Sequence, residues 1–169
     1  MSFKTKFLFL DIDGVLNADS TTTEVTPEGF TFVEDRLIEK LKRIIDATNA
    51  KVVLSSDWRF EHPRFDDDNP DAKMGLNLSL LIRKLADFGI NLYGMTSVMR
   101  RRRGEEIENW LDKNECKFGG MSNINYVILD DLPWSEFHGH DEHFVQTDDY
   151  IGITDEDVEK AIAILNKEN

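Results

Sequence analysis

Two aspartates that follow a short apolar run are the residues of this sequence best suited to chemistry. Asp11 and Asp13 come directly after residues 7–10 (Phe-Leu-Phe-Leu) and are followed by Gly14, which lets the chain turn sharply. The run is typical of a strand buried on both faces, and residues i and i+2 of an extended chain point the same way. Two like charges held close together repel each other. The pair therefore predicts a site for a cation, a shared proton or both.

Hydroxyl and acidic residues also follow two later apolar segments. Ser55 and Ser56 end the first segment, and Asp130 and Asp131 end the second. Because the carboxyl ends of parallel strands meet at one edge of a sheet, we expect all these side chains to lie near Asp11. Carboxylates at Asp11, Asp130 and Asp131 can surround one Mg²⁺, a cation that prefers oxygen ligands.

This set of residues suits the hydrolysis of a phosphate ester. One carboxylate can attack phosphorus, and a second, Asp13, can protonate the leaving oxygen and then activate water. A hydroxyl and a cation would hold the phosphate oxygens. The arginine run 100–103 precedes an expected helix, and Arg103, nearest the helix, is the candidate phosphate ligand.

The elements that must position these residues alternate between strands and helices over one domain, residues 1–169. This order predicts an α/β fold with a mostly parallel sheet and helices on both faces. Strands are expected at 6–11, 51–55, 90–93, 125–130 and 143–146, and helices at 34–47, 76–88, 105–113 and 154–166. Two further segments, 14–33 and 57–75, are expected as a flap-like loop or hairpin and as a loop insertion.

Composition narrows the class of protein. The net charge of −13 argues against coating of nucleic acid or of anionic membranes by general electrostatics. No apolar stretch approaches the length of a membrane span, and the first residues lack the layout of a signal peptide. The single cysteine, Cys116, cannot form an internal disulfide. We expect a cytoplasmic enzyme or binding domain without a membrane partner, as a monomer or weak dimer.

The ordered motifs resemble the haloacid dehalogenase-like (HAD) superfamily. They are Asp11-x-Asp13-Gly14, a hydroxyl after the second strand, a basic residue before a helix, and Asp130-Asp131. The resemblance implies a three-layer Rossmann-like HAD fold, phosphatase activity and a Mg²⁺ cofactor.

The same resemblance implies individual roles. Asp11 would be the nucleophile that forms an aspartyl-phosphate. Asp13 would be the general acid/base, and its backbone carbonyl would ligate Mg²⁺. Register against the strand makes Ser56 a better hydroxyl than Ser55. Arg103 stands where the superfamily usually has Lys; it can bind phosphate bidentately but cannot change protonation.

A narrower resemblance connects the chain with small HAD domains of Swiss Army knife RNA repair proteins. It rests on residues 54–59, 103–111 and 128–131. It implies a phosphorylated substrate such as a polynucleotide end or a related phosphomonoester. Because residues 14–33 and 57–75 are too short for a cap domain, we expect a minimal cap and an open site.

The substrate contacts and the function keep alternatives. Gly14, Ser55, Asp57 and Arg59 are candidate substrate-binding residues. The alternative activities are a phosphatase of small metabolites or nucleotides and a non-catalytic phosphoryl-binding module. A receiver-like module with Asp57 as phosphoacceptor is disfavoured, because it needs another strand and helix before that residue.

Two aromatic features are expected to be structural. Trp58 is expected to form a packed wall. The three histidines His138, His140 and His143 are expected to be solvated loop residues rather than zinc ligands, since no cysteine lies near them.

Overall fold

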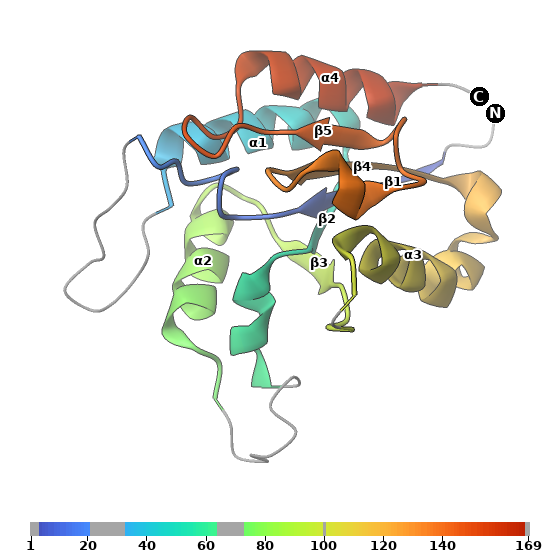
Figure 1. The fold of residues 1–169 in the computed structure, drawn as a ribbon, viewed down its shortest axis with the longest axis horizontal. Helices are drawn as coiled ribbons and strands as arrows, with labels where there is room; N and C mark the ends of the chain where they lie inside the picture. The colour runs from blue at the N-terminus through green and yellow to red at the C-terminus, as the bar shows by residue number, and fades with distance from the viewer. Residues whose placement is uncertain (1–3, 21–32, 64–72, 100, 168–169) are drawn as a thin grey trace.

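The computed structural model describes residues 4–20, 33–63, 73–99 and 101–167. Over these residues a five-stranded sheet with order β3-β2-β1-β4-β5 is parallel throughout, with helices on both faces (Figure 1). The expected α/β fold is confirmed. The strands are β1 (Thr5–Leu10), β2 (Lys51–Leu54), β3 (Leu92–Met95), β4 (Ile124–Asp130) and β5 (Phe144–Gln146); the α-helices are α1 (Asp35–Thr48), α2 (Leu76–Asp87), α3 (Arg103–Asn114) and α4 (Asp155–Asn166).

The alternation of side chains along β1 divides the core between the two faces of the sheet. Leu8 and Leu10 pack into a large cluster with apolar residues of α1, α2 and α4, whereas Phe7 and Phe9 pack against α3. Helices α1 and α4 lie side by side on one face, and α3 covers the other (Figure 1). Both faces of β1 are therefore buried, as its continuous apolar run predicts.

The register of the sheet places the motifs at one edge. Leu10 is level with Leu54 on β2 and with Leu129 on β4. The residues that follow Leu10, Leu54 and Leu129 along the chain are Asp11, Ser55 and Asp130, respectively. The hydrogen bonds between β1 and β4 extend to this edge, because the Asp11 amide donates to the Leu129 carbonyl at 3.0 Å. The chain order reverses beside β1, at the kind of switch point where open α/β sheets bind ligands.

The expected loops are only partly described. Residues 21–32 of the expected flap and 64–72 of the expected insertion lie outside the described residues. The start of the insertion forms a short 3₁₀-helix, η1 (Asp57–Glu61). Among the described residues, no helix has both the length and the apolar character that a membrane span requires.

The histidine prediction is wrong for His140, which is buried. Its Nδ1 lies 2.8 Å from the Tyr126 hydroxyl and its Nε2 lies 3.2 Å from the Gly104 carbonyl, and burial lowers its pKa. His143 is half-buried and stacks on Tyr126, whereas His138 is exposed. The chain between β4 and β5 folds back onto Tyr126 and the start of α3, a tertiary contact that no local pattern reveals.

Candidate active site

Three carboxylates converge at the carboxyl edge of the sheet. Asp11, Asp130 and Asp131 each offer an oxygen atom, and these atoms lie within 4.8 Å of one another. Asp130 is fully buried; its Oδ1 accepts a hydrogen bond from the Leu132 amide at 3.0 Å, but its Oδ2 has no partner among the described residues. A buried oxygen without a donor is costly, so this group is poised for a ligand that the protein itself does not supply.

The electrostatics of the three carboxylates favour the binding of a cation. Burial raises the pKa of Asp11 to about 7, against the opposing effects of Arg103 and of a hydrogen bond with Ser56. Burial and the neighbouring Asp11 hold the pKa of Asp130 well above its usual range. Burial also raises the pKa of Asp131. A set made only of carboxylate oxygens that resist carrying charge together fits Mg²⁺, which would stabilise all three as anions.

Gly14 permits the close approach of Asp131. Its φ is +69°, and a Cβ atom there would lie 2.6 Å from the Asp131 Cβ. Its amide donates to Asn17 Oδ1 at 2.9 Å, and its carbonyl accepts from the Thr147 hydroxyl at 2.8 Å. This geometry lets Gly14 position Asp131, and its expected contact with substrate stays a prediction.

Asp13 lies at the exposed mouth of the site rather than within the three-carboxylate cluster. Its Oδ1 accepts a hydrogen bond from Asn17 Nδ2 at 2.7 Å, and its Oδ2 accepts one from Trp58 Nε1 at 2.9 Å. The two donors fix the carboxyl group while leaving it open to solvent. Neither donor is identifiable from the sequence. Trp58 is indeed packed, at 9% exposure, but its indole N–H has a partner in the site.

The two serines differ in what they contribute. Ser56 is fully buried, and its side chain is hydrogen-bonded to Asp11. The Ser55 hydroxyl is buried without a partner among the described residues, and its backbone carbonyl accepts a hydrogen bond from Arg103 Nη1. The structure thus places the Ser56 side chain beside Asp11, the expected nucleophile, whereas the Ser55 backbone carbonyl holds the Arg103 guanidinium.

Arg103 is the first residue of α3, and its guanidinium lies near Asp11. Its Nη1 is 3.8 Å from Asp11 Oδ1, and its Nη2 is 3.1 Å from Asp57 Oδ1. The Arg103 side chain is only 10% exposed, whereas that of Asp57 is 70% exposed. The guanidinium therefore lies beside the candidate nucleophile, and Asp57 orients it from the solvent side.

The other arginines lie away from Asp11. Arg101 and Arg102 are exposed, and Arg101 lies 3.6 Å from Glu105. Arg100 is outside the described residues.

Arg59 does not occupy the position expected of a substrate contact. It is 2% exposed, forms an ion pair with the buried Glu106, and donates from Nη1 to the Thr96 hydroxyl at 2.9 Å. Glu106 in turn accepts from the Met99 amide at 2.8 Å. Because Arg59 lies in η1 and Glu106 in the first turn of α3, the buried ion pair joins these two elements. The arrangement makes Arg59 a positioning residue for the segment that carries Arg103.

Comparison with known proteins agrees with this geometry. Residues 7–158 match the family model described as the HAD domain in Swiss Army Knife RNA repair proteins. A comparison with curated proteins finds no match. The matched segment runs from β1 into α4 and contains every site residue named above. The chain therefore belongs to the family of HAD domains found in Swiss Army Knife RNA repair proteins.

Proposed function

We propose that this protein is a Mg²⁺-dependent phosphomonoester hydrolase that acts through a phosphoryl-enzyme on Asp11. One observation carries the proposal: the Asp11 carboxylate has the Arg103 guanidinium 3.8 Å away and two further carboxylates whose oxygens lie within 4.8 Å of its own. An anionic nucleophile can attack an anionic phosphate only where the charge on both is neutralised. The family membership supports the same class of reaction.

The residues have separate tasks in this scheme. Asp11, Asp130 and Asp131 would hold Mg²⁺ through carboxylate oxygens, together with the Asp13 backbone carbonyl that the HAD resemblance implies. When bound, the metal would supply positive charge against the phosphate and the carboxylates. Arg103 would bind phosphate oxygens through its guanidinium. The Ser56 hydroxyl, hydrogen-bonded to Asp11, would orient the attacking carboxylate and stay close to the transferred group.

The reaction proceeds in two displacements. In the first, an Asp11 oxygen forms a bond to phosphorus while the bond to the leaving oxygen breaks, and Asp13 donates its proton to that oxygen. In the second, Asp13 removes a proton from water, the water oxygen bonds to phosphorus, and the bond to Asp11 breaks. Phosphate is released, and both aspartates return to their starting states. The exposed position of Asp13, held by Asn17 and Trp58, suits contact with a leaving group and with water.

The substrate class that we propose is the phosphorylated end of a polynucleotide. The description of the matched family, which refers to RNA repair, supports this choice. The exposed Arg101 and Arg102 next to Arg103 also support it, because they offer cations to a substrate larger than a single phosphate. Small phosphorylated metabolites and nucleotides are the alternative substrates, and the substrate panel described next distinguishes them from polynucleotide ends.

The experiment measures phosphate release with Mg²⁺ from an aryl phosphate, from nucleotides, and from oligonucleotides that bear 3′- or 5′-phosphates. Asp11→Asn should reduce the rate at least about 10⁴-fold, as expected for loss of a nucleophile. Asp87→Asn is the matched control, because Asp87 is an exposed aspartate at the end of α2. Equal rates in wild type and Asp11→Asn would refute the assignment of the nucleophile.

A further inference from the structure

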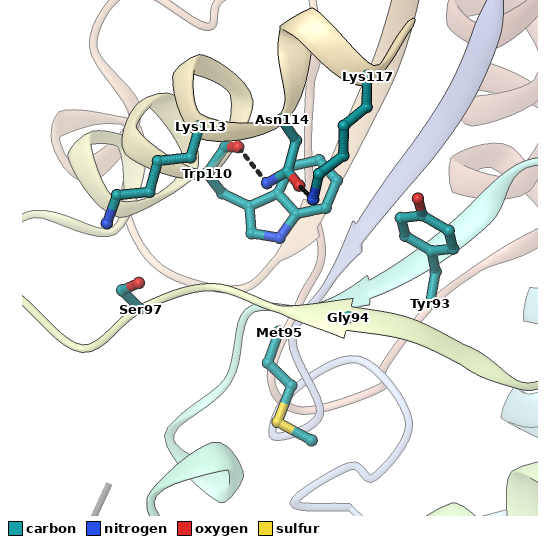
Figure 2. Close-up of a pocket in the computed structure, with 8 residues that line it drawn as sticks. All are labelled: Tyr93, Gly94, Met95, Ser97, Trp110, Lys113, Asn114 and Lys117. Carbon is teal, nitrogen blue, oxygen red and sulfur yellow. Dashed lines mark hydrogen bonds between the residues drawn. The ribbon is translucent and has the colours of Figure 1, made fainter. Parts of the chain in front are cut away.

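A groove between β3 and α3 lies outside the carboxylate cluster. Its volume is about 670 Å³, and its lining includes Tyr93, Gly94, Ser97, Trp110, Lys113 and Lys117 (Figure 2). Within the described sheet β3 is an edge strand, so no further strand covers this side. The lining contains no Asp or Glu. The groove therefore combines aromatic and cationic groups without an acidic one.

The aromatic part of the groove is a supported platform. Tyr93 is 45% exposed, and its ring packs edge-on against Trp110, with ring centroids 6.3 Å apart, and tilted against Phe118 at 6.4 Å. Trp110 is 7% exposed, and its indole N–H faces β3, where a Cβ added to Gly94 would lie 3.6 Å from Nε1 (Figure 2). That N–H has no hydrogen-bond acceptor among the described residues. An exposed ring and a free donor both favour a flat, polar-edged ligand such as a nucleobase.

The lysines of the groove are not neutralised by carboxylates. Lys113 forms no ion pair within the described chain, and Lys117 donates to the neutral Asn114 Oδ1 at 2.7 Å. Lys51 Nζ lies over the Tyr93 ring, 4.6 Å from its centroid. Elsewhere in this acidic protein the lysines mostly pair with carboxylates: Lys40, Lys42, Lys84, Lys160 and Lys167 all do. Unpaired cations beside an aromatic ring are what a polyanion with stacking bases requires.

The connection between β3 and α3 links the groove to the candidate active site. Ser97 lies just beyond β3 at the carboxyl edge of the sheet, and the same connection enters α3 at Arg103. Lys113 is ten residues further along α3, a distance of about 15 Å at 1.5 Å per residue. A stacked strand advances about 3.4 Å per nucleotide, so this distance corresponds to about four nucleotides.

We propose that the β3–α3 groove binds the single-stranded segment that leads away from the phosphorylated end of a polynucleotide substrate. Bases stack on Tyr93 and accept from the Trp110 N–H, while Lys113 and Lys117 contact backbone phosphates about four nucleotides from the end. This inference rests on the proposed function for the identity of the end. Binding in the groove has a separate consequence: the affinity for a single strand should rise with its length until the strand reaches Lys113 and Lys117.

The test measures binding rather than turnover, so that it stands apart from the phosphatase proposal. Fluorescence anisotropy on the Asp11→Asn protein with Mg²⁺ compares labelled single-stranded RNA dinucleotides and octanucleotides that bear a 3′- or a 5′-phosphate. The octanucleotide with the preferred end should bind at least tenfold more tightly than the matching dinucleotide. In Lys113→Gln/Lys117→Gln this ratio should fall below threefold. The log–log slope of octanucleotide binding against salt should become shallower by about 0.7 for each phosphate that the lysines no longer neutralise.

Two controls make the result specific to the groove. Lys160→Gln/Lys167→Gln removes the same charge from α4 and its C-terminal end, on the opposite face of the sheet, and should keep the length dependence. Tyr93→Ala should reduce the ratio without changing the salt slope, because stacking involves no counterion release. Circular dichroism checks that each variant is folded.

Three results would overturn the proposal. The first is equal affinity for the two lengths. The second is an equal fall of the ratio in the α4 control. The third is a ratio unchanged in Lys113→Gln/Lys117→Gln, which would point to another partner for the groove. Length-dependent binding without hydrolysis of any phosphate ester would support the groove proposal and refute the proposed function. Hydrolysis without length-dependent binding would support the proposed function and refute the groove proposal.

Discussion

Two clusters of buried charge lie near the carboxyl edge of the same sheet, and they are partnered in opposite ways. Arg59 and Glu106 form an ion pair, and hydrogen bonds with Thr96 and the Met99 amide leave only Arg59 Nε without a partner among the described residues. The three carboxylates, in contrast, gather negative charge around the unpartnered Asp130 Oδ2. In the first cluster nearly all the charged groups have partners within the protein, whereas the second leaves a buried carboxylate oxygen without one among the described residues.

This contrast separates positioning from chemistry among buried charges. A compensated pair holds elements in place, here η1 against the start of α3. In the carboxylate set, burial and mutual repulsion raise the pKa values of Asp11 and Asp130 despite the nearby Arg103, and in the proposed function a bound cation would offset that cost. Arg103 connects the two regions: it starts the helix that the ion pair secures, and its guanidinium approaches Asp11.

After Asp11, the largest effect is expected at Asp13, which transfers the proton in the proposed mechanism. Asp13→Asn should lower turnover by about 10²–10⁴-fold, since the amide cannot protonate a leaving group. The decrease should be greater for alkyl phosphates than for aryl phosphates, whose leaving groups need less help. Steady-state rates across a series of leaving groups measure this. Equal decreases throughout the series would contradict the role of Asp13 as general acid.

The ion pair should matter mainly for stability. Glu106→Gln leaves Arg59 buried without its counter-charge and should reduce the free energy of unfolding by about 3–5 kcal/mol. Glu156→Gln, which removes an exposed partner of Lys160, should leave the free energy of unfolding nearly unchanged. Urea denaturation compares the two. Similar decreases in both variants would remove the distinction between the clusters.

Arg103 should affect catalysis more than folding. Arg103→Met should lower kcat/KM by about 10²–10³-fold, because the cation stabilises charge that develops on the phosphate. Arg103→Lys should recover part of the activity by restoring the charge without the bidentate fork. Kinetics on one aryl phosphate measures both variants. A lysine variant no better than the methionine variant would assign Arg103 a purely geometric role.

The weakest effect concerns metal and pH. Because burial raises the pKa of Asp11 from 3.8 to about 7, the metal-free folded protein loses stability as the pH rises from about 4 through 7, where the carboxylate must ionise. Mg²⁺ would bind the ionised form and should offset that loss. The increase in Tm on adding Mg²⁺ should therefore be a few degrees larger at about pH 8 than at about pH 5.

Differential scanning fluorimetry measures this increase, with Asp130→Asn as the variant that should lose it. A Mg²⁺ effect that is equal at both pH values, or that survives in Asp130→Asn, would argue against metal binding by the carboxylate cluster.

The fold and the convergence of the main motifs are predictable because they depend on local patterns. The apolar runs before Asp11, Ser55 and Asp130 set three buried parallel strands, and parallel register brings their ends to one edge. The helix expected over 154–166 is α4, which begins at a capping box of Thr154 and Asp157, with Asp in place of the usual Glu or Gln.

What the sequence could not reveal depends on contacts between distant segments. Arg59 and Glu106 are 47 positions apart, and His140 meets Tyr126 and Gly104 only after the chain folds back. The N–H of Trp58 reaches Asp13 across 45 positions. A polar residue next to a motif has the same local signal whether it faces substrate or a buried partner, which is why the sequence alone does not reveal that Arg59 pairs with Glu106.

The phosphoryl-enzyme itself can be trapped, and this is the most direct test of the mechanism. The protein is mixed with Mg²⁺ and an excess of a phosphate ester that it hydrolyses, quenched in acid during turnover, digested and analysed by tandem mass spectrometry. We expect one added phosphoryl group on Asp11, absent from Asp11→Asn. Turnover with Asp11 unmodified and the phosphoryl group on another residue, such as Asp57, would contradict the mechanism.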